Sequence, residues 1–425
     1  MNLKISKRDF VEYVILIALV FQIFIVKWLD LTIRYSYIII FLLFFHFILN
    51  LKRYGKLSSV LFTLFLIIIY VLLNVKLLGK SQNILNNNLK MILPSLFILP
   101  FVSYMLVYKR KVIEKFLLKS ILIFNLYYII NIPVIIFELK GMTSLAGRHP
   151  SNIRYTLIED MGSGLLGYYG TPILGLFFAF MMIYNMYYSR YIGNKNKRRI
   201  FKAYNILMFI CMIWLSTQND NKGAIFISFI FIGVYKFFTN IDNLDKKITS
   251  KVINTLKYTL SVCIAGGISF WIISKIPALN SAFEAIIARV QEGIDLGVKA
   301  TGSAERIGAL VFILTDSEHK YFGYGIGNYG WRQSNAFGLY NFGQSDLSVL
   351  IILGGIVLLL LLLLILFFTF LSSSKNICLS TVLVVFFAIL NIYTQVITEP
   401  SAMYIFVLFS FVCIQSSGFK NVTVE

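Results

Sequence analysis

The chain has 425 residues, of which 58% are hydrophobic and only 14% are charged. A water-soluble globule could not bury that much apolar surface, so the composition excludes this class and indicates an all-α, polytopic membrane protein. The formal net charge of +20 is explained most simply by basic loops held in the cytoplasm beside anionic membrane lipid. We therefore expect no nucleic-acid partner.

Apolar segments recur from one end of the chain to the other. A bilayer whose hydrocarbon core is about 30 Å thick is crossed by roughly 17 to 25 helical residues. We predict twelve transmembrane helices, at residues 10–27, 35–51, 58–78, 91–108, 118–138, 164–189, 200–217, 223–239, 254–275, 346–371, 376–397 and 400–416. The chain then divides into helices one to nine (1–275), a large loop (276–345), and three final helices with a tail (346–425).

Basic clusters occupy every second predicted loop, and they set the orientation because Lys and Arg in short loops stay in the cytoplasm. The clusters are Lys4/Lys7/Arg8, Lys52/Arg53/Lys56, Lys109/Arg110/Lys111/Lys115, Arg190/Lys195/Lys197/Arg198/Arg199 and Lys246/Lys247/Lys251. Both termini are thus predicted in the cytoplasm, and residues 139–163 and 276–345 outside the cell. No small-residue cleavage site follows Val26, so we interpret the first helix as a retained signal anchor.

Cysteine and histidine give no sign of a metal centre. Cys211, Cys263, Cys378 and Cys413 lie in predicted helices without CxxC spacing, so neither disulfides nor a zinc site is expected. His46 lies in the second predicted helix, where we interpret it as a packed core residue rather than a proton relay.

The large loop contains two predicted helices. Residues 280–292 place Phe283, Ile286, Ile287 and Val290 on one face, which is typical of an amphipathic helix lying on the membrane. Ser303 is then expected to cap a second helix, in which Glu305 favours the positive end of the helix dipole. The apolar stripe of this second helix comprises Ile307, Leu310, Val311 and Leu314.

Glycine occupies every second position just after this helix, at Gly323-Tyr-Gly-Ile-Gly327. Neither a strand nor a βαβ unit surrounds these glycines, so a dinucleotide site is not expected. We predict a tight turn whose neighbours face a groove and stack on sugar rings. These neighbours are Tyr324, Asn328, Tyr329 and Trp331. A loop that merely folds back on the helix bundle is the alternative for each of them.

This arrangement resembles the O-antigen polymerase and ligase superfamily, which contains the Wzy-type polymerases and WaaL-type ligases of bacterial surface polysaccharides. The resemblance covers nearly the whole chain, in the helix count, the large late loop and several short motifs. In the large loop, the matching signals are Gly302-Ser303, Arg306, the turn at 322–328 and Gly355-Ile356 in the next helix. In the smaller loop they are Arg154, then Gly162, Gly164 and Gly167, and the pair Thr171-Pro172.

The chain departs from the family pattern at two places. Where the family often shows Ser-Arg-Gly between the seventh and eighth helices, the basic residue is Lys222, which lacks the bidentate guanidinium of arginine. Where the ligases show a histidine at the base of the tenth helix, this chain has Gln344-Ser345. Since glutamine cannot take a proton, a catalytic base would have to be Asp346, His319 or Glu318.

The resemblance implies metal-independent glycosyl transfer, with no cofactor, on the outer face of the bacterial cytoplasmic membrane, in a fold of the GT-C type. Its substrates would be oligosaccharides linked to undecaprenyl pyrophosphate, and its partners the flippase and chain-length regulator of the same pathway. Arginines can grip a pyrophosphate bidentately and stabilise it as it leaves, which makes Arg148, Arg154, Arg289 and Arg306 the candidates. An interfacial arginine paired with an acid or a lipid headgroup is the alternative for each.

Two other functions remain open at this level. A WaaL-like ligase would pass glycan to a different acceptor, and the missing histidine weighs against it. A flippase or other transporter also has about twelve helices, but transporters are commonly built from repeats with broken midplane helices and short loops, and the sequence contains no evident repeat.

Overall fold

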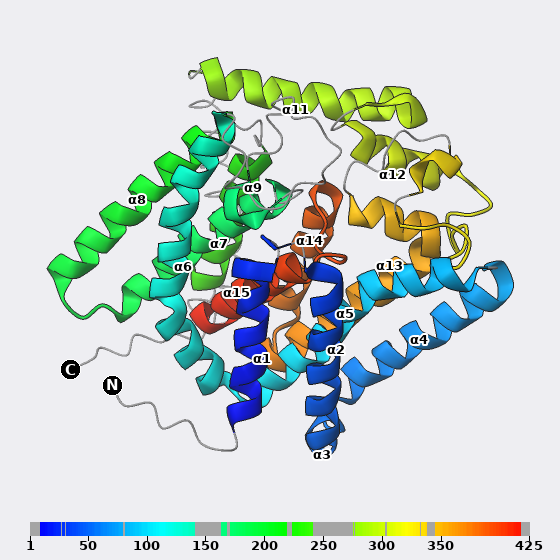
Figure 1. The fold of residues 1–425 in the computed structure, drawn as a ribbon, viewed down its shortest axis with the longest axis horizontal. Coiled ribbons are helices and arrows are strands. Elements are labelled where there is room, and N and C mark those ends of the chain that lie inside the picture. The colour runs from blue at the N-terminus through cyan, green and yellow to red at the C-terminus, as the bar shows by residue number, and fades with distance from the viewer. Residues whose placement is uncertain are drawn as a thin grey trace, which may run out of the picture.

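The computed structural model describes residues 9–26, 28–29, 31–79, 81–140, 163–167, 171–218, 223–240, 275, 277–301, 304–331, 333–337 and 345–417. Every regular element within these ranges is helical, as Figure 1 shows. Six helices are long and apolar enough to cross a membrane: α4 (Ser58–Leu78), α5 (Gln82–Tyr108), α6 (Arg110–Leu139), Lys195–Ser216 within α8 (Lys195–Gln218), α13 (Asp346–Ser374) and α15 (Pro400–Ser417). The prediction of a helical membrane protein is confirmed at this level.

The remaining helices of the bundle are shorter. They are α1 (Phe10–Phe21) with its π-helical continuation Gln22–Val26, α2 (Thr32–Leu49), α3 (Leu51–Tyr54), α7 (Thr171–Tyr188), α9 (Gly223–Asn240) and α14 (Ile377–Tyr393). Described helices overlap every predicted span except 254–275, of which the structure describes residue 275 alone. Because six of them meet the length and hydropathy of a membrane crossing, the count of twelve stays a prediction.

Helix α15 forms the centre of the bundle. Nearly every residue from Pro400 to Ser416 is buried, which is expected of a helix that is enclosed by protein on all sides. Helices α5, α7 and α9 pack against it. Aromatic rings fill the contacts: the ring of Phe409 lies 4.3 Å from that of Phe231 and 5.4 Å from that of Phe386, between ring centroids.

Helix α13 is interrupted at Gly355. This residue has φ 70° and ψ 176°, so the helix consists of two halves separated by a non-helical residue. All residues from Asp346 to Gly355 are buried, although they belong to a segment of high mean hydropathy. Irregular backbone at membrane depth is tolerated where other protein groups satisfy its hydrogen bonds, so we expect protein groups around Gly355 to bond the backbone of the break.

Two helices of the large loop lie outside the bundle, along one edge of the molecule in Figure 1. Helix α11 (Pro277–Leu296) contains the predicted segment 280–292, and Ile287 on its predicted apolar face is 53% exposed. This exposure is compatible with a face turned toward lipid. Helix α12 (Glu305–Thr315) packs against both α11 and α13.

The predicted stripe and cap of α12 need correction. The buried residues are Glu305, Gly308, Ala309 and Ile313, whereas Leu314 of the predicted stripe is 46% exposed. Position 308 requires glycine, because a Cβ there would lie 2.2 Å from the carbonyl oxygen of Gly297. The N-cap is Ala304, without a side-chain cap, and Ser303 lies outside the described residues.

His46 is buried as predicted, but it also belongs to an ionisable cluster. Its Nδ1 lies 3.1 Å from the Tyr54 hydroxyl, and its Nε2 lies 3.6 Å from Oε1 of Glu12. Lys109 Nζ lies 3.4 Å from the same Glu12 oxygen and also contacts Asp9. Burial of the Glu12 carboxylate and the Lys109 ammonium is possible because the two opposite charges lie within reach of each other.

Candidate functional site

The break in α13 is filled by the backbone of the large loop. Carbonyls that end the first half of α13 accept hydrogen bonds from this loop, and amides that begin the second half donate to it. The pairs are Tyr324 N to Ile352 O (2.8 Å), Gly325 N to Leu353 O (3.0 Å), Ile356 N to Lys320 O (2.9 Å) and Val357 N to Tyr321 O (3.2 Å). We name residues 319–325 together with 352–357 the α13 junction. It replaces helical hydrogen bonds that the break removes.

Two glycines make this close approach possible. A Cβ on Gly355 would lie 2.0 Å from the carbonyl oxygen of Tyr321, and one on Gly323 would lie 2.5 Å from the carbonyl group of Leu353. Both glycines also have positive φ, at 70° and 74°, which other residues adopt only with strain. The glycine-rich turn is therefore a packing device that attaches the loop to α13.

Helices α4 and α5 hold the other side of the loop. The Tyr70 hydroxyl donates to the carbonyl of Gly354 (2.6 Å), and Asn74 Nδ2 donates to that of Phe322 (2.8 Å). Asn88 Nδ2 donates to the carbonyls of Ile326 (2.7 Å) and Tyr329 (2.8 Å). Nothing in the sequence pattern pointed to these side chains, because polar residues inside an apolar helix give no sign of the loop that they bind.

A compact polar group lies at the surface side of the junction. Asp316 Oδ2 lies 3.0 Å from Nδ1 of His319 and also accepts a hydrogen bond from the Tyr324 hydroxyl, while its other oxygen accepts from backbone amides of the turn. The imidazole of His319 stacks on the Tyr324 ring at 4.0 Å between centroids and 6° between planes. One carboxylate thus fixes the orientation of both rings.

The electrostatics of this group follow from the same contacts. Burial acts to raise the pKa of Asp316, but the hydrogen bonds from Tyr324 and from the backbone amides of His319 and Glu318 outweigh it and lower the pKa to about 2. Burial and the Asp316 carboxylate raise the pKa of Tyr324. At neutral pH the group therefore contains an ionised carboxylate beside an imidazole and a neutral phenol. Asp316 was missed in the sequence, although its position three residues before His319 in a polar turn was the available signal.

The predicted sugar-binding residues lie in different environments. Tyr324 and Tyr329 are partly buried and form an aromatic cluster with Phe312 and Phe337. Asn328 Nδ2 donates to the backbone carbonyl of Tyr324 at 3.1 Å, which stabilises the turn. Trp331 is only 4% exposed, so it does not face an open groove as predicted.

Asp346 is at the start of α13, as the sequence predicted, but it is not accessible. It is fully buried, and its carboxylate accepts hydrogen bonds from the Thr398 amide (2.8 Å), the Thr398 hydroxyl (2.7 Å) and Trp331 Nε1 (3.4 Å). Ser345, not Asp346, caps α13 through its hydroxyl. Asp346 therefore joins α13 to the turn before α15, and its burial argues against Asp346 as the catalytic base among the three candidates.

Of the four arginines predicted to bind pyrophosphate, the structure describes Arg306 and Arg289. Arg306 is in the first turn of α12, where its backbone carbonyl accepts a hydrogen bond from Ser348 Oγ at 3.1 Å and so fixes that turn on α13. Arg289 lies on exposed α11 and donates to Glu292 Oε2 at 2.5 Å, which lowers the pKa of Glu292. Arg148, Arg154 and Lys222 lie outside the described residues. Glu318 is exposed beside His319.

The described end of the smaller loop is anchored in the same manner as the larger one. Glu138 Oε2 accepts from Gly164 N (2.8 Å), and Asn131 Oδ1 accepts from Leu165 N (2.6 Å). Gly164 has φ 59°, and a Cβ there would lie 2.2 Å from Asn131 Oδ1. Glycines in both loops thus allow backbone to contact a helix.

No family model matches this chain, and none of the curated proteins does. Within the described residues, no three side chains of His, Cys, Asp or Glu gather as a metal site would require. The candidate residues that the structure describes are therefore the Asp316–His319–Tyr324 group, which follows the C-terminal end of α12, and Arg306 in the first turn of α12, about 15 Å away along the helix axis at about 1.5 Å per residue.

Proposed function

We propose that this protein is a glycosyltransferase that joins oligosaccharide repeat units, linked to undecaprenyl pyrophosphate, into a surface polysaccharide of the capsule or O-antigen type. The observation that carries the proposal is the imidazole of His319, oriented by the Asp316 carboxylate on a loop that is fastened to α13. An oriented imidazole of this kind is suited to general-base work. The motif resemblance over 302–328 and at Gly355-Ile356 supplies the substrate class.

In this proposal His319 accepts the proton of the attacking sugar hydroxyl. The hydroxyl oxygen forms a bond to the anomeric carbon of the second substrate, the bond from that carbon to the pyrophosphate oxygen breaks, and undecaprenyl pyrophosphate leaves with the electron pair. Arg306, at the N-terminal turn of α12, stabilises the leaving pyrophosphate together with the amides of that turn. Arg148, Arg154 and Lys222 are proposed to assist from the smaller loop and the segment after α8, and Arg289 from α11.

The sugar residues are proposed to stack on the half-buried rings of Tyr324 and Tyr329, with Asn328 shaping the turn between them. Tyr324 would thus have two roles, because its ring both binds sugar and stacks on the His319 imidazole. Asp346 and Trp331 are proposed to support the site from within, because burial removes both from contact with a substrate. The proposed topology has twelve spans, both termini in the cytoplasm and the large loop outside.

The test is repeat-unit polymerisation in membranes that contain equal amounts of each variant. His319→Gln is expected to lower the rate by about 100- to 10,000-fold, the usual contribution of a positioned base. Arg306→Lys should lower the polymerisation rate nearly as much as Arg306→Ala, because lysine cannot bind phosphate bidentately. Ser317→Ala, in the same exposed turn, is the matched control and should be fully active. Full activity of His319→Gln would refute the assignment of the base.

One observation favours a transporter as the second candidate. A membrane helix broken at Gly355 is the kind of element on which secondary transporters build substrate sites. Here, however, four of the backbone groups exposed by the break are bonded to the loop, so they are not open to a substrate. Purified protein in vesicles separates the candidates: lipid-linked glycan that changes leaflet without lengthening indicates a flippase, and glycan transferred once to a different acceptor indicates a WaaL-like ligase.

A further inference from the structure

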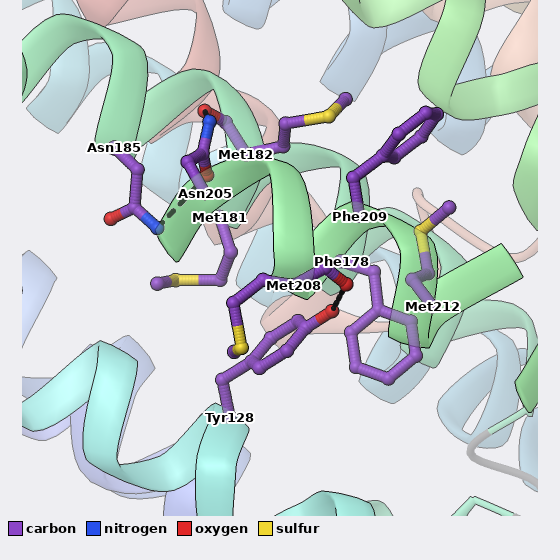
Figure 2. A pocket seen from close by; sticks show the side chains of 9 residues that line it. All are labelled: Tyr128, Phe178, Met181, Met182, Asn185, Asn205, Met208, Phe209 and Met212. Carbon is purple, nitrogen blue, oxygen red and sulfur yellow. Dashed lines mark hydrogen bonds between the residues drawn. The ribbon is translucent and has the colours of Figure 1, made fainter. Parts of the chain in front are cut away.

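Buried polar side chains in this bundle generally bond to other protein groups, and the floor of a groove between α7, α8 and α9 shows this (Figure 2). There, the Tyr128 hydroxyl donates to the Met208 carbonyl at 2.7 Å. Asn185 Nδ2 donates to Asn205 Oδ1 at 3.1 Å. Such bonding is expected, because a polar group out of reach of water is costly unless it is hydrogen-bonded. Buried polar atoms that lack a partner therefore require an explanation.

Three atoms of this kind belong to residues 391–401, which we name the α14–α15 turn. They are Asn391 Oδ1, Thr394 Oγ1 and Ser401 Oγ, and none of them has a hydrogen-bond partner among the described residues. All three residues are at most 1% exposed. Asn391 Nδ2 donates to the Phe387 carbonyl at 2.8 Å, so the oxygen is the end of this amide that remains without a partner. The turn thus contains one amide oxygen and two hydroxyl oxygens that can each accept.

Hydrogen bonds attach the α14–α15 turn to the start of α13. The Ser345 hydroxyl donates to the Asn391 carbonyl at 3.1 Å, which joins the end of α14 to the cap of α13. Asp346 accepts from the amide and the hydroxyl of Thr398, in the same turn, at 2.8 Å and 2.7 Å. The Asp346 carboxylate and the three oxygens therefore belong to one buried polar region, where α13, α14 and α15 meet.

Asp346 brings a negative charge to this region when its carboxyl is ionised. Its donors within the described part of the chain are neutral, namely the Thr398 amide and hydroxyl and Trp331 Nε1. The positive end of α13 contributes only about half an elementary charge. The neighbouring Glu399 carboxylate lies 3.5 Å from the Ser401 amide, in the first turn of α15. Because a buried carboxylate is costly without a full opposite charge, the region is suited to a cation.

We propose that this region binds one monovalent metal cation of the Na⁺ or K⁺ type. Asn391, Thr394 and Ser401 supply oxygen ligands, which are the hard ligands that such cations prefer. The Asp346 carboxylate supplies the counter-charge: one carboxylate balances one positive charge, whereas Ca²⁺ sites commonly use several. A single ion needs no open cavity, which agrees with the burial of these residues. The proposal does not depend on glycosyl transfer.

The experiment is thermal unfolding of the purified full chain in an uncharged detergent. It is carried out in NaCl, in KCl and in N-methyl-D-glucamine chloride at the same ionic strength, so that general charge screening is constant. We expect Na⁺ or K⁺ to raise the melting temperature by roughly 1–3 °C over N-methyl-D-glucamine, because a ligand of the folded state stabilises it by mass action. Equal melting temperatures in the three salts would overturn the proposal and leave a proton on Asp346 as the balancing charge.

Two variants remove a proposed ligand without adding bulk. Thr394→Val and Ser401→Ala should each abolish the shift that Na⁺ or K⁺ produces. Neither should lower the melting temperature in N-methyl-D-glucamine, because the hydroxyl that is lost has no partner among the described residues. This combination separates a cation ligand from a structural hydroxyl, whose loss would destabilise the protein in every salt.

The matched controls are Thr369→Val on α13 and Ser410→Ala on α15. Both hydroxyls belong to buried residues, and each donates to a carbonyl of its own helix, at 2.8 Å and 2.9 Å. These variants should keep the cation-dependent shift. A shift that persists in Thr394→Val and Ser401→Ala would overturn the proposal. A loss of stability of these two variants in N-methyl-D-glucamine would also overturn it, in favour of a buried water that bridges the hydroxyls.

Discussion

The α13 junction and the groove between α7, α8 and α9 both interrupt the packing of one helix bundle, but they treat polar groups in opposite ways. At the junction, loop and helix satisfy each other's backbone groups, and glycines bring them into direct contact. The groove between α7, α8 and α9 has a volume of about 430 Å³ and is lined by basic side chains (Arg190, Lys202, Lys236) together with apolar ones. The comparison teaches that an irregular helix is not in itself a ligand site.

The largest expected effect tests whether the two regions face opposite sides of the membrane. In a chain without Cys211, Cys263, Cys378 and Cys413, Lys299→Cys should react with an impermeant maleimide in intact cells, whereas Lys197→Cys should react only after permeabilisation. Both positions are exposed, so access to the reagent is limited by the membrane alone. If Lys299→Cys required permeabilisation, the proposed site would face the cytoplasm and glycosyl transfer outside the cell would be excluded.

The next effect concerns the glycine at the break. Gly355→Ala should remove most of the folded protein, because a Cβ would overlap the Tyr321 carbonyl and the φ of 70° adds about 1–3 kcal/mol of strain. Membrane abundance and the gel-filtration profile in detergent measure this. Gly233→Ala on α9 is the control, since a Cβ there meets nothing within 4 Å. Normal abundance of Gly355→Ala would show that the junction can open without loss of the fold.

Substitutions of Asp346 test how strongly the packing of α13 against the turn before α15 depends on a single buried carboxylate. Asp346→Ala leaves the Thr398 amide and hydroxyl and Trp331 Nε1 without an acceptor, at about 1–3 kcal/mol for each buried donor left unpaired. Asp346→Asn retains one carbonyl oxygen and should lose less. Thermal unfolding in detergent should therefore rank wild type above Asn and Asn above Ala. Equal melting temperatures would mean that water replaces the carboxylate.

The outcome for Asp346 illustrates what the sequence could and could not predict. Helix positions followed from apolar segments, because a bilayer sets segment length whatever the neighbours are: the predicted span 58–78 is α4. The partners of polar side chains did not follow. Asp346 and Thr398 are 52 residues apart, and only tertiary packing brings them together. A carboxylate at a helix start has the same local sequence whether it caps the helix or, as here, supports a distant turn.

The glycine-rich turn illustrates the same limit from the other direction. Its composition correctly predicted a tight turn, because the glycines at 323 and 325 have positive φ. The sequence could not show that the turn enters a break in α13. The break depends on Gly355, which is thirty residues along the chain from Gly325, and in the sequence Gly355 looks like any other glycine within an apolar helix. Burial of Trp331 follows from this docking, because the docked turn places its indole beside Asp346.

A smaller effect on stability is expected from Asp316, at the surface side of the α13 junction. Its pKa is lowered to about 2 from an ordinary value of 3.8, so its contribution to stability is fully present above about pH 4 and is lost as the pH falls toward 2. In Asp316→Asn this contribution is absent at all pH values. The difference in melting temperature between wild type and Asp316→Asn should therefore be largest above pH 4 and should shrink between pH 4 and pH 2. A constant difference would mean that hydrogen bonding, rather than charge, is what the carboxylate provides.

The smallest effect comes from one hydroxyl, that of Tyr70 on α4, which contacts the carbonyl oxygens of Gly354 and, at 3.4 Å, Phe322. Tyr70→Phe removes the bond from the hydroxyl to the Gly354 carbonyl, at 2.6 Å, while it keeps the ring in place, so a loss of about 1 kcal/mol in the free energy of unfolding is expected. Tyr37→Phe on α2, whose side chain is 46% exposed, is the matched control and should be neutral. The two variants are compared by thermal unfolding in the same detergent. A larger loss in Tyr70→Phe, close to that of Gly355→Ala, would mean that one side chain holds the junction closed. The junction would then be a switchable element rather than a fixed part of the fold, and the contrast with the groove would no longer hold.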